Sequence, residues 1–459
     1  MPPKVRPSAP HTTGPSTPNA IEREFDWYVG IDGGGATHQV GVLDAEGRTV
    51  AERAVAHSGA DIAAFGTWLH SLVGSSLARV AVGVESPHAG PVALVLEQGA
   101  AVFTINPKQL ERFRERASAA GVKDDRRDAY VAASAVRTDR GAFHRLASAD
   151  ARVVAVRELS RLADELGDDA RRLANRLRAL LERYFPQMLT LVPAADEAWL
   201  WTLLTTVPTP AAAARVREAT VARVLRAHRI RRLKAPEVVA ALRTPALVVT
   251  PGTVAAVSAH VAVLVPQLQL VSEQHRRCVA QLEAALTALA ATDDEPPPPA
   301  GTTAGLEPNA VAVDSAPGEP ARRGLGSIIR VVRSLPGVGC RVAGTLVAEA
   351  AAALETADCH ALRTHGGTAP VTKQSGKRRV VGMRYACNPR LRTALYHWAR
   401  VSTQHDASAC AYYATLRARG HSHARALRSV ADRWLRILSA MLVTGTPYDA
   451  GRFAVTGTP

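Results

Sequence analysis

The stretch Trp27–Asp44, WYVGIDGGGATHQVGVLD, decides the fold of the first part of this chain. Its pattern predicts a strand, a glycine-rich turn and a second strand. The first apolar run, Trp27–Ile31, ends directly at Asp32. A carboxylate at the end of a buried strand is costly unless something neutralises it, and a divalent metal ion is the usual solution. The rest of the chain must therefore supply the acidic residues that join Asp32.

The size of the chain exceeds one ordinary core. With 459 residues we expect two or three domains, and 47% hydrophobic with 21% charged residues is typical of a globular protein. The sequence has no uninterrupted apolar run of the roughly eighteen residues that a membrane span needs, so we expect no membrane partner. The five cysteines lie far apart without a C-x-x-C pair, which argues against a structural zinc site and for a reducing, cytoplasmic compartment.

Positive charge is concentrated in the last third of the chain. The formal net charge is +15, and residues 321–459 hold 21 Lys and Arg against 6 Asp and Glu, so the first 320 residues are neutral overall. A solvated surface of mixed sign is the ordinary explanation of charged residues. A domain of one sign and this size instead favours a surface that binds a polyanion, because phosphate neutralisation dominates nucleic-acid binding.

Residues 25–148 alternate strand-like and helix-like segments, which predicts an α/β domain. After the first hairpin we expect a helix near 60–73, a second buried strand over 79–84 that ends at Glu85, a short strand over 99–105 and a charged helix over 108–119. Parallel sheets present functional groups at the carboxyl ends of their strands. Asp32 and Glu85 both occupy such ends.

Two more acids follow in the segment KDDRRDAY, residues 123–130. Asp125 and Asp128 are three residues apart, which on a helix places both on one face. Asp124 has an equally suitable spacing to Asp128, so spacing does not choose between the two. The alternative is that these acids pair with the neighbouring basic residues on a solvated surface. Together with Asp32 and the second strand-end acid, they favour a site for Mg²⁺, or Mn²⁺.

Two long apolar seams predict a helical region over residues 149–292. One runs from Arg157 to Leu181, and the other runs from Val257 to Leu289 with a bend expected at Pro266. Their spacing indicates a coiled coil, formed by the two helices with each other or across subunits. Residues 1–24 are expected to be a disordered leader, and the acidic, proline-rich segment 293–322 is expected to be a linker.

Residues 323–459 form the basic domain, and a serine lies among its cations. Ser375 stands in KQSGKRR, residues 373–379. A single serine in a loop is usually a turn residue. A serine that attacks a phosphodiester needs positive charge around the transition state, and this one has it. We expect nucleic-acid contacts from Lys373, Lys377, Arg378, Arg379, Arg384, Asn388, Arg390 and Arg392.

Taken in order, these segments resemble the DEDD transposases of bacterial insertion sequences, a family understood as bridge-RNA-guided serine recombinases. The resemblance covers residues 27–449. The stretches that carry it include VGIDGGGATHQVGVLD, VGVES, INPKQLERF, KDDRRDA, LPGVGCRVAGTLVAE, LRTHGGTAPVTKQSGKRR and CNPRLRTAL. The chain departs from the family pattern at Gly33–Gly35, at Ser86–His88 and at Cys387.

The resemblance implies a RuvC-like (RNase H-like) N-terminal domain, a coiled-coil insertion and a mainly helical C-terminal transposase domain. It implies that Asp32, Glu85, Asp125 and Asp128 are the metal-binding acidic residues, and it selects Asp125 over its neighbour. It implies that Ser375 is the nucleophile. Donor and target DNA, a structured noncoding bridge RNA and a homo-oligomer, either a dimer or a tetramer, are the implied partners, in the bacterial cytoplasm at the nucleoid.

Three other functions fit parts of the sequence. The segment GIDGGGAT is close to the phosphate loop of sugar kinases and actin-like ATPases. Such an ATPase needs a second Asp-Gly hairpin, and residues 150–290 instead predict helices. A RuvC-like nuclease or resolvase that uses only the carboxylates, without serine chemistry, is the second alternative. An inactive nucleic-acid-binding descendant is the third.

Overall fold

The computed structural model describes residues 24–85, 90–117, 124–146, 150–291, 323–375 and 378–453. The chain divides into two compact units, residues 1–149 and 150–459. The expected leader and the expected linker lie almost entirely outside the described residues. The five-part domain division of the sequence analysis therefore remains a prediction at those boundaries.

The first unit is built on a six-stranded sheet with the order β3-β2-β1-β4-β5-β6. Strands β1, β4 and β5 are parallel, and the other neighbours pair antiparallel. The strands are β1 (Trp27–Gly33), β2 (Thr37–Leu43), β3 (Thr49–Ala56), β4 (Val80–Val84), β5 (Ala101–Thr104) and β6 (His144–Leu146). The predicted hairpin at Asp32 is confirmed as β1 and β2, and the strands predicted over 79–84 and 99–105 are confirmed as β4 and β5. Strand β3 was not predicted, because its mostly exposed side chains lack an apolar run.

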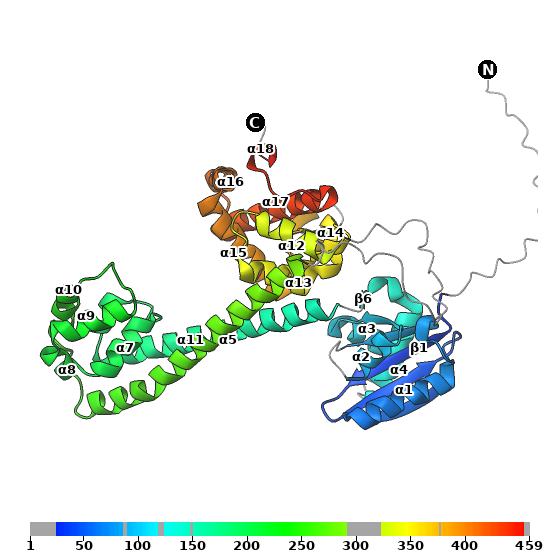
Figure 1. The fold of residues 1–459 in the computed structure, drawn as a ribbon. Coiled ribbons are helices and arrows are strands. Elements are labelled where there is room, and N and C mark those ends of the chain that lie inside the picture. Colours follow the sequence, from blue (N-terminus) through cyan, green and yellow to red (C-terminus); the bar gives the residue numbers. More distant parts are fainter. Residues whose placement is uncertain are drawn as a thin grey trace, which may run out of the picture. The chain divides into compact units, whose positions relative to one another are not determined.

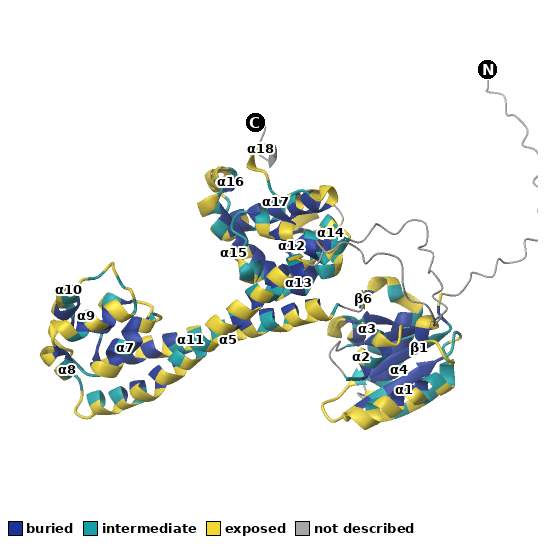
Figure 2. Cartoon of the chain, in the orientation of Figure 1, coloured by how far each residue is buried: buried dark blue, intermediate teal, exposed yellow. Residues whose placement is uncertain are grey.

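Helices cover both faces of this sheet (Figure 1), so the unit has three layers. Helices α1 (Gly59–Val73) and α2 (Gly90–Glu97) pack on one face, around a core that includes Val29, Phe65 and Val82. Helices α3 (Pro107–Ala117) and α4 (Asp125–Asp139) pack on the other, where Leu110 and Val136 are buried. The central strands β1, β4 and β5 are largely buried between the layers (Figure 2).

Two long helices form the axis of the second unit. Helix α5 (Ala151–Tyr184) and helix α11 (Thr253–Ala291) lie side by side and antiparallel (Figure 1). The apolar seam predicted for α11 is confirmed, since Val257, Leu264, Leu282 and Leu289 are all buried. The seam predicted for α5 included Leu162, and this part was wrong, because Leu162 is 45% exposed. The two helices thus pair within the chain.

Helix α11 continues without a break through Pro266. By length and composition alone, this helix is apolar enough to cross a membrane. Its buried residues instead pack into the two helical cores described below. Its thiol at Cys278 donates to the carbonyl oxygen of Leu159 on α5 at 3.3 Å. One side of α11 therefore packs against protein, whereas Val263 and Leu270 on this helix are exposed.

Each end of this helix pair carries a helical core. At one end lie the short helices α6 (Gln187–Leu191), α7 (Ala198–Thr206), α8 (Pro210–Arg215), α9 (Glu218–Ala227) and α10 (Ala235–Leu242). At the other end lie α12 (Leu325–Ser334), α13 (Cys340–Glu355), α14 (Cys359–His365), α15 (Pro389–His405), α16 (Ala407–Ala418) and α17 (His423–Thr444). Helix α18 (Ala450–Phe453) ends the described part. Between α14 and α15 the chain forms a two-stranded hairpin of β7 (Val371–Ser375) and β8 (Arg378–Gly382).

Candidate functional site

Asp32 and Glu85 occupy neighbouring positions at the carboxyl edge of the first unit's sheet. Strands β1 and β4 are parallel, and Ile31 pairs with Val84, so the two acids are the next residues on adjacent strands. Adjacent strands lie about 4.8 Å apart. Both residues are half-buried. The expected convergence of the two strand-end acids is therefore present in the backbone.

Helix α4 covers the face of the sheet to which Asp32 belongs. Gly30 and Gly83 stand two residues before the two strand-end acids, and α4 crosses these glycines so closely that a Cβ at Gly30 would overlap the carbonyl oxygen of Ala129. A Cβ at Gly83 would lie 2.5 Å from the carbonyl oxygen of Ala132. Side chains two residues apart on a strand share a face. Asp32 therefore belongs to the face on which α4 packs, and Glu85 directly follows β4 at the same edge.

The direction of α4 brings its first turn to the same edge. Its C-terminal part lies at the opposite edge, where Arg137 lies beside Gly47 in the β2–β3 turn. Just beyond the helix, Arg140 forms an ion pair of 2.9 Å with Glu24, which precedes β1. The helix therefore runs antiparallel to β1. Its N-terminal turn, which begins at Asp125, points to the edge that holds the strand-end acids.

Asp128 is the most buried of the four acids. Its side chain is 3% exposed, and its Oδ1 accepts a hydrogen bond of 2.5 Å from Nε of Arg114 on α3. A buried carboxylate requires a cationic partner or a metal ion, and here the guanidinium fills that need. Arg114 was not among the residues predicted from the sequence. The signal was present, since Arg114 follows the buried Leu110 by four residues and so shares its inward face.

Asp124 and Asp125 have different roles in the helix. Asp124 is the N-cap of α4, and its side chain accepts from the backbone N–H of Arg126. Asp125 is the first residue of the helix and is exposed. A capping carboxylate satisfies a helix N–H that would otherwise be unpaired. Asp124 thus serves as the cap of α4, and the choice of Asp125 as the metal-binding acid stays a prediction of the resemblance.

The four acids supply the donor chemistry of a divalent ion site but are not gathered as one. All are carboxylates, the ligands that Mg²⁺ and Mn²⁺ prefer. Within the described ranges, no group of three or more His, Cys, Asp or Glu side chains is close enough to hold an ion. The hydrogen bond from Arg114 directs the carboxylate of Asp128 to α3. This is one physical reason why the four acids do not form a single group. Residues 86–89, which directly follow Glu85, and residues 118–123, which end two positions before Asp125, lie outside the described residues.

Ser375 is the last residue of β7, at the tip end of the hairpin in the second unit, and it is exposed. It pairs directly with Arg378 on β8. Residues opposite each other in an antiparallel pair project on the same face, with their Cβ atoms about 5 Å apart. Arg379 pairs with Gln374 and projects on the other face. Pairing thus places one of the neighbouring arginines beside the serine and the other away from it.

The other residues predicted to contact nucleic acid differ in the bonds that they already make within the protein. Asn388 caps α15 and donates to Glu349 at 2.7 Å. Arg390 pairs with Asp164 and Glu165 on α5, and Arg392 donates to the carbonyl oxygen of Tyr385 at 2.9 Å. The Nε of Arg384 donates to the carbonyl oxygen of Ala369 at 3.3 Å. The side chains of Lys373 and Lys377 lie outside the described residues. All these roles in nucleic-acid binding remain predictions.

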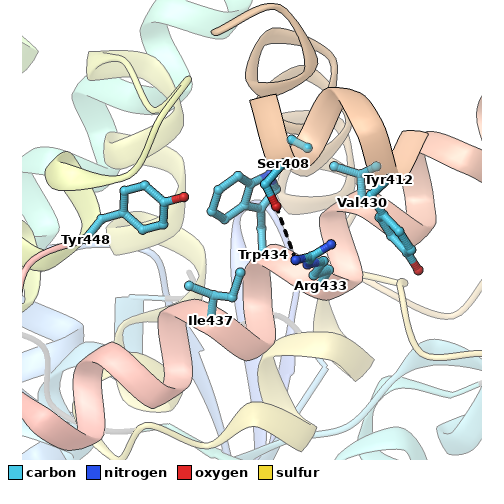
Figure 3. A pocket seen from close by; sticks show the side chains of 8 residues that line it. Ser408, Tyr412, Val430, Arg433, Trp434, Ile437 and Tyr448 are labelled. Atoms are coloured by element: carbon cyan, nitrogen blue, oxygen red, sulfur yellow. Dashed lines mark hydrogen bonds between the residues drawn. The ribbon is translucent and has the colours of Figure 1, made fainter. Parts of the chain in front are cut away.

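A small cavity between α16, α17 and the C-terminal turn is not a ligand site (Figure 3). It is lined by Trp434, Tyr448 and Ile437, and Arg433 donates to Ser408 across it at 3.2 Å. Its volume of about 10 Å³ barely holds one water molecule. The hydroxyl of Tyr448 donates to Asp406, and burial together with that carboxylate raises the pKa of Tyr448 to about 12. This region therefore stabilises the helical core.

Two family models match separate parts of the chain. A family model described as Transposase (DEDD_Tnp_IS110) matches residues 29–186. A second, described as Transposase IS116/IS110/IS902 family, matches residues 329–414. The first contains all four acids, and the second contains Ser375. The second glycine hairpin of an ATPase has no counterpart in residues 150–291, whose described elements are helices.

Three individual relatives are also named as transposases or as a protein of an insertion element. Putative transposase y4uE of Sinorhizobium fredii is 45% identical over 210 residues, which are 46% of this chain and 58% of that protein. The mini-circle putative transposase for IS117 of Streptomyces coelicolor is 29% identical over 439 residues, covering 93% of this chain and 96% of that protein. The insertion element IS110 uncharacterized 43.6 kDa protein of the same organism is 26% identical over 432 residues, 92% of this chain and 95% of that protein. The chain thus belongs to the IS110 family of transposases, enzymes that cut and rejoin DNA.

Proposed function

We propose that this transposase cuts and rejoins the DNA of an insertion sequence through a covalent intermediate on Ser375, assisted by divalent ions at the acidic site. The observation that carries the serine part is the direct pairing of Ser375 with Arg378 on an exposed hairpin. A nucleophile that attacks DNA must be accessible, and it needs a cation beside the phosphate. Both conditions are met by local structure.

The acidic site belongs to the same proposal. Asp32, Glu85, Asp125 and Asp128 would hold Mg²⁺ or Mn²⁺, which supplies Lewis-acid stabilisation of charge on a phosphoryl oxygen. For Asp128 to take part, its bond to Arg114 must open. The sheet, with parallel strands at its centre and an antiparallel hairpin at one side, supports the RuvC-like (RNase H-like) assignment that the resemblance implies.

The covalent step balances without an added reagent. The Oγ atom of Ser375 attacks phosphorus, an Oγ–P bond forms, and one P–O bond to a neighbouring sugar breaks. The sugar leaves as an alcohol and carries the proton that the serine loses. Attack by a sugar alcohol of another strand reverses the step and restores a phosphodiester. Arg378 stabilises the negative charge that builds on the phosphoryl oxygens in both directions.

The partners in this proposal follow from the resemblance and from charge. Donor and target DNA are chosen by a structured noncoding bridge RNA, and the active assembly is a dimer or tetramer in the bacterial cytoplasm, at the nucleoid. The excess positive charge of residues 321–459 supports binding to both nucleic acids. No membrane partner is involved.

Replacement of Ser375 tests the nucleophile. In Ser375→Ala we expect no protein–DNA adduct and at least about a thousandfold less strand transfer, because the attacking oxygen is gone. DNA binding should persist, since no charge is removed. Thr372→Ala is the matched control, because Thr372 is an exposed hydroxyl residue on the same strand whose side chain projects on the other face. Strand transfer by Ser375→Ala would instead establish the metal-only nuclease or resolvase mechanism.

The two arginines of the hairpin test the geometry of the charge. Arg378→Gln and Arg379→Gln remove the same charge one residue apart. We expect the first to lower the rate of adduct formation by about a hundredfold, and the second to lower it only slightly. Equal losses in both variants would contradict the pairing of Arg378 with the serine.

A further inference from the structure

Two cavities adjoin at the base of the β7–β8 hairpin. The first, which we name the arginine groove, has a volume of about 510 Å³ and is lined by Arg363, Arg384, Arg425, Arg428 and Arg436. The second, which we name the apolar pocket, has a volume of about 250 Å³ and is lined by Met383, Leu395, Tyr396, Ala424 and Ala431. Thr368, Met383 and Arg428 line both, so the two cavities share a wall.

The arginine groove has more positive charge than the protein neutralises. Its one acidic lining residue, Asp432, is already bonded to Arg363 at 2.6 Å, to Arg436 at 3.1 Å and to Thr368 at 3.0 Å. Within the described part of the chain, the guanidinium groups of Arg425 and Arg428 have no hydrogen-bond or ion-pair partner. Guanidinium groups bind phosphate through paired hydrogen bonds. The groove therefore matches a phosphate-bearing ligand.

The apolar pocket has one aromatic wall in a fixed position. The hydroxyl of Tyr396 lies 3.4 Å from Nε2 of His423, whose Nδ1 lies 2.8 Å from the hydroxyl of Tyr413. These contacts orient the ring of Tyr396, which is 38% exposed. Apolar side chains form much of the rest of the lining. Unpaired nucleobases stack on aromatic side chains in this way.

We propose that the two cavities together bind one unpaired nucleotide of a DNA strand, with its base in the apolar pocket and its phosphates in the arginine groove. A base in a duplex is stacked and paired, so only an extruded or single-stranded base can enter such a pocket. The shared residue Arg428 lies at the boundary, where the sugar–phosphate of that nucleotide would pass. This site was not expected from the sequence.

The position of the cavities favours DNA over RNA. This step rests on the proposed function, in which the hairpin engages a DNA backbone at Ser375. Val381 and Arg384 line the groove, and Val381 is three residues along β8 from Arg378, the partner of Ser375. Three strand residues span about 10 Å, close to the rise of three nucleotides in one strand. The bound nucleotide would flank the phosphodiester that the serine attacks.

Binding by the full-length Ser375→Ala chain tests this site without chemistry. The probes are a short oligothymidine, an oligouridine and an oligonucleotide without bases, all of the same length, with affinities measured by fluorescence anisotropy. Ala424→Leu narrows the apolar pocket from its exposed side, and Ala414→Leu is the control on an exposed position of α16. Arg428→Gln removes a shared cation, and Arg419→Gln is its exposed control. Circular dichroism and thermal unfolding confirm that each variant is folded.

We expect Ala424→Leu to weaken binding of oligothymidine by about fivefold or more, the lower range for one stacked base, and to leave the base-free probe unchanged. Arg428→Gln should weaken binding of both probes. The control variants Ala414→Leu and Arg419→Gln should weaken binding of either probe less than the variants that they control for. Equal effects of Ala424→Leu on both probes would overturn the assignment. An effect on oligouridine alone would assign the site to RNA and overturn the DNA proposal. Adduct formation by the unmodified chain is measured separately, so failure of the serine mechanism is distinguishable from failure of this site.

Discussion

The acidic site and the serine hairpin are built in opposite ways. Asp128 lies in the interior with a side chain 3% exposed, on helix α4, which packs closely against Gly30 and Gly83 of the sheet. Every residue of β8, beside Ser375, is exposed. Metal ligands must be held in fixed positions, which requires packing on all sides. A nucleophile for DNA must instead reach a bulky substrate. In the proposed mechanism, the first unit orients the metal-binding carboxylates, and the second unit supplies access and positive charge.

The largest expected effect concerns the charge of the second unit. If six or more phosphates are contacted, DNA affinity should fall on the order of a thousandfold or more between dilute and moderate salt. Replacing Arg378 and Arg379 together with Gln should lower the slope of log affinity against log salt by about two, whereas Asp32→Asn should leave it unchanged. Titrations at several salt concentrations measure both. A DNA affinity that does not depend on salt would contradict the proposal that the second unit binds DNA through its positive charge.

The next effect separates the two neighbouring acids of the first unit. Asp125→Asn should lower DNA cleavage by about a hundredfold and weaken Mn²⁺ binding measured by calorimetry, because a metal ligand loses its charge. Asp124→Asn should retain both, since asparagine caps a helix as well as aspartate does. If Asp124→Asn lost more cleavage and Mn²⁺ binding than Asp125→Asn, Asp124 would replace Asp125 in the proposed acidic site.

A glycine tests the packing that positions the acids. Gly30→Ala places a Cβ against the carbonyl oxygen of Ala129, so α4 must move, and we expect a loss of about 2 kcal/mol in the free energy of unfolding. Gly35→Ala is the matched control, since no atom lies within 4 Å of a Cβ there. Denaturant titrations measure the difference. Unchanged stability in Gly30→Ala would show that the contact of α4 with β1 is not needed.

The smallest expected effect concerns a buried carboxylate that holds helices together in the second unit. Burial raises the pKa of Glu349, but hydrogen bonds from Arg161 and Asn388 outweigh it and lower the pKa below the ordinary value. The stabilisation is therefore complete above the unfolded pKa and is lost as pH falls through the lowered one. Glu349→Gln should cost on the order of 1 kcal/mol at neutral pH and less in acid. If the loss of stability in Glu349→Gln were the same at neutral and acidic pH, a stabilising role of the Glu349 carboxylate would be contradicted.

Much of the fold could be predicted because its signals are local. The run Trp27–Ile31, the run that ends at Glu85 and the seam of α11 each follow the period of their own element. Strand β3 and the β7–β8 hairpin were missed, because exposed strands carry no apolar pattern. The identities of the four acids and of Ser375 came from spacing and resemblance, and their functional roles remain predictions.

The sequence by itself determined which segments are helices or strands in the first unit's core, where the positive charge lies and which family the chain resembles. The tertiary structure decided which residues meet. It brought Arg114 to Asp128, placed Arg378 beside Ser375 and Arg379 away from it, and joined five arginines in one groove. The physical reason is that periodicity acts over a few residues, whereas contacts between distant segments depend on how whole faces pack.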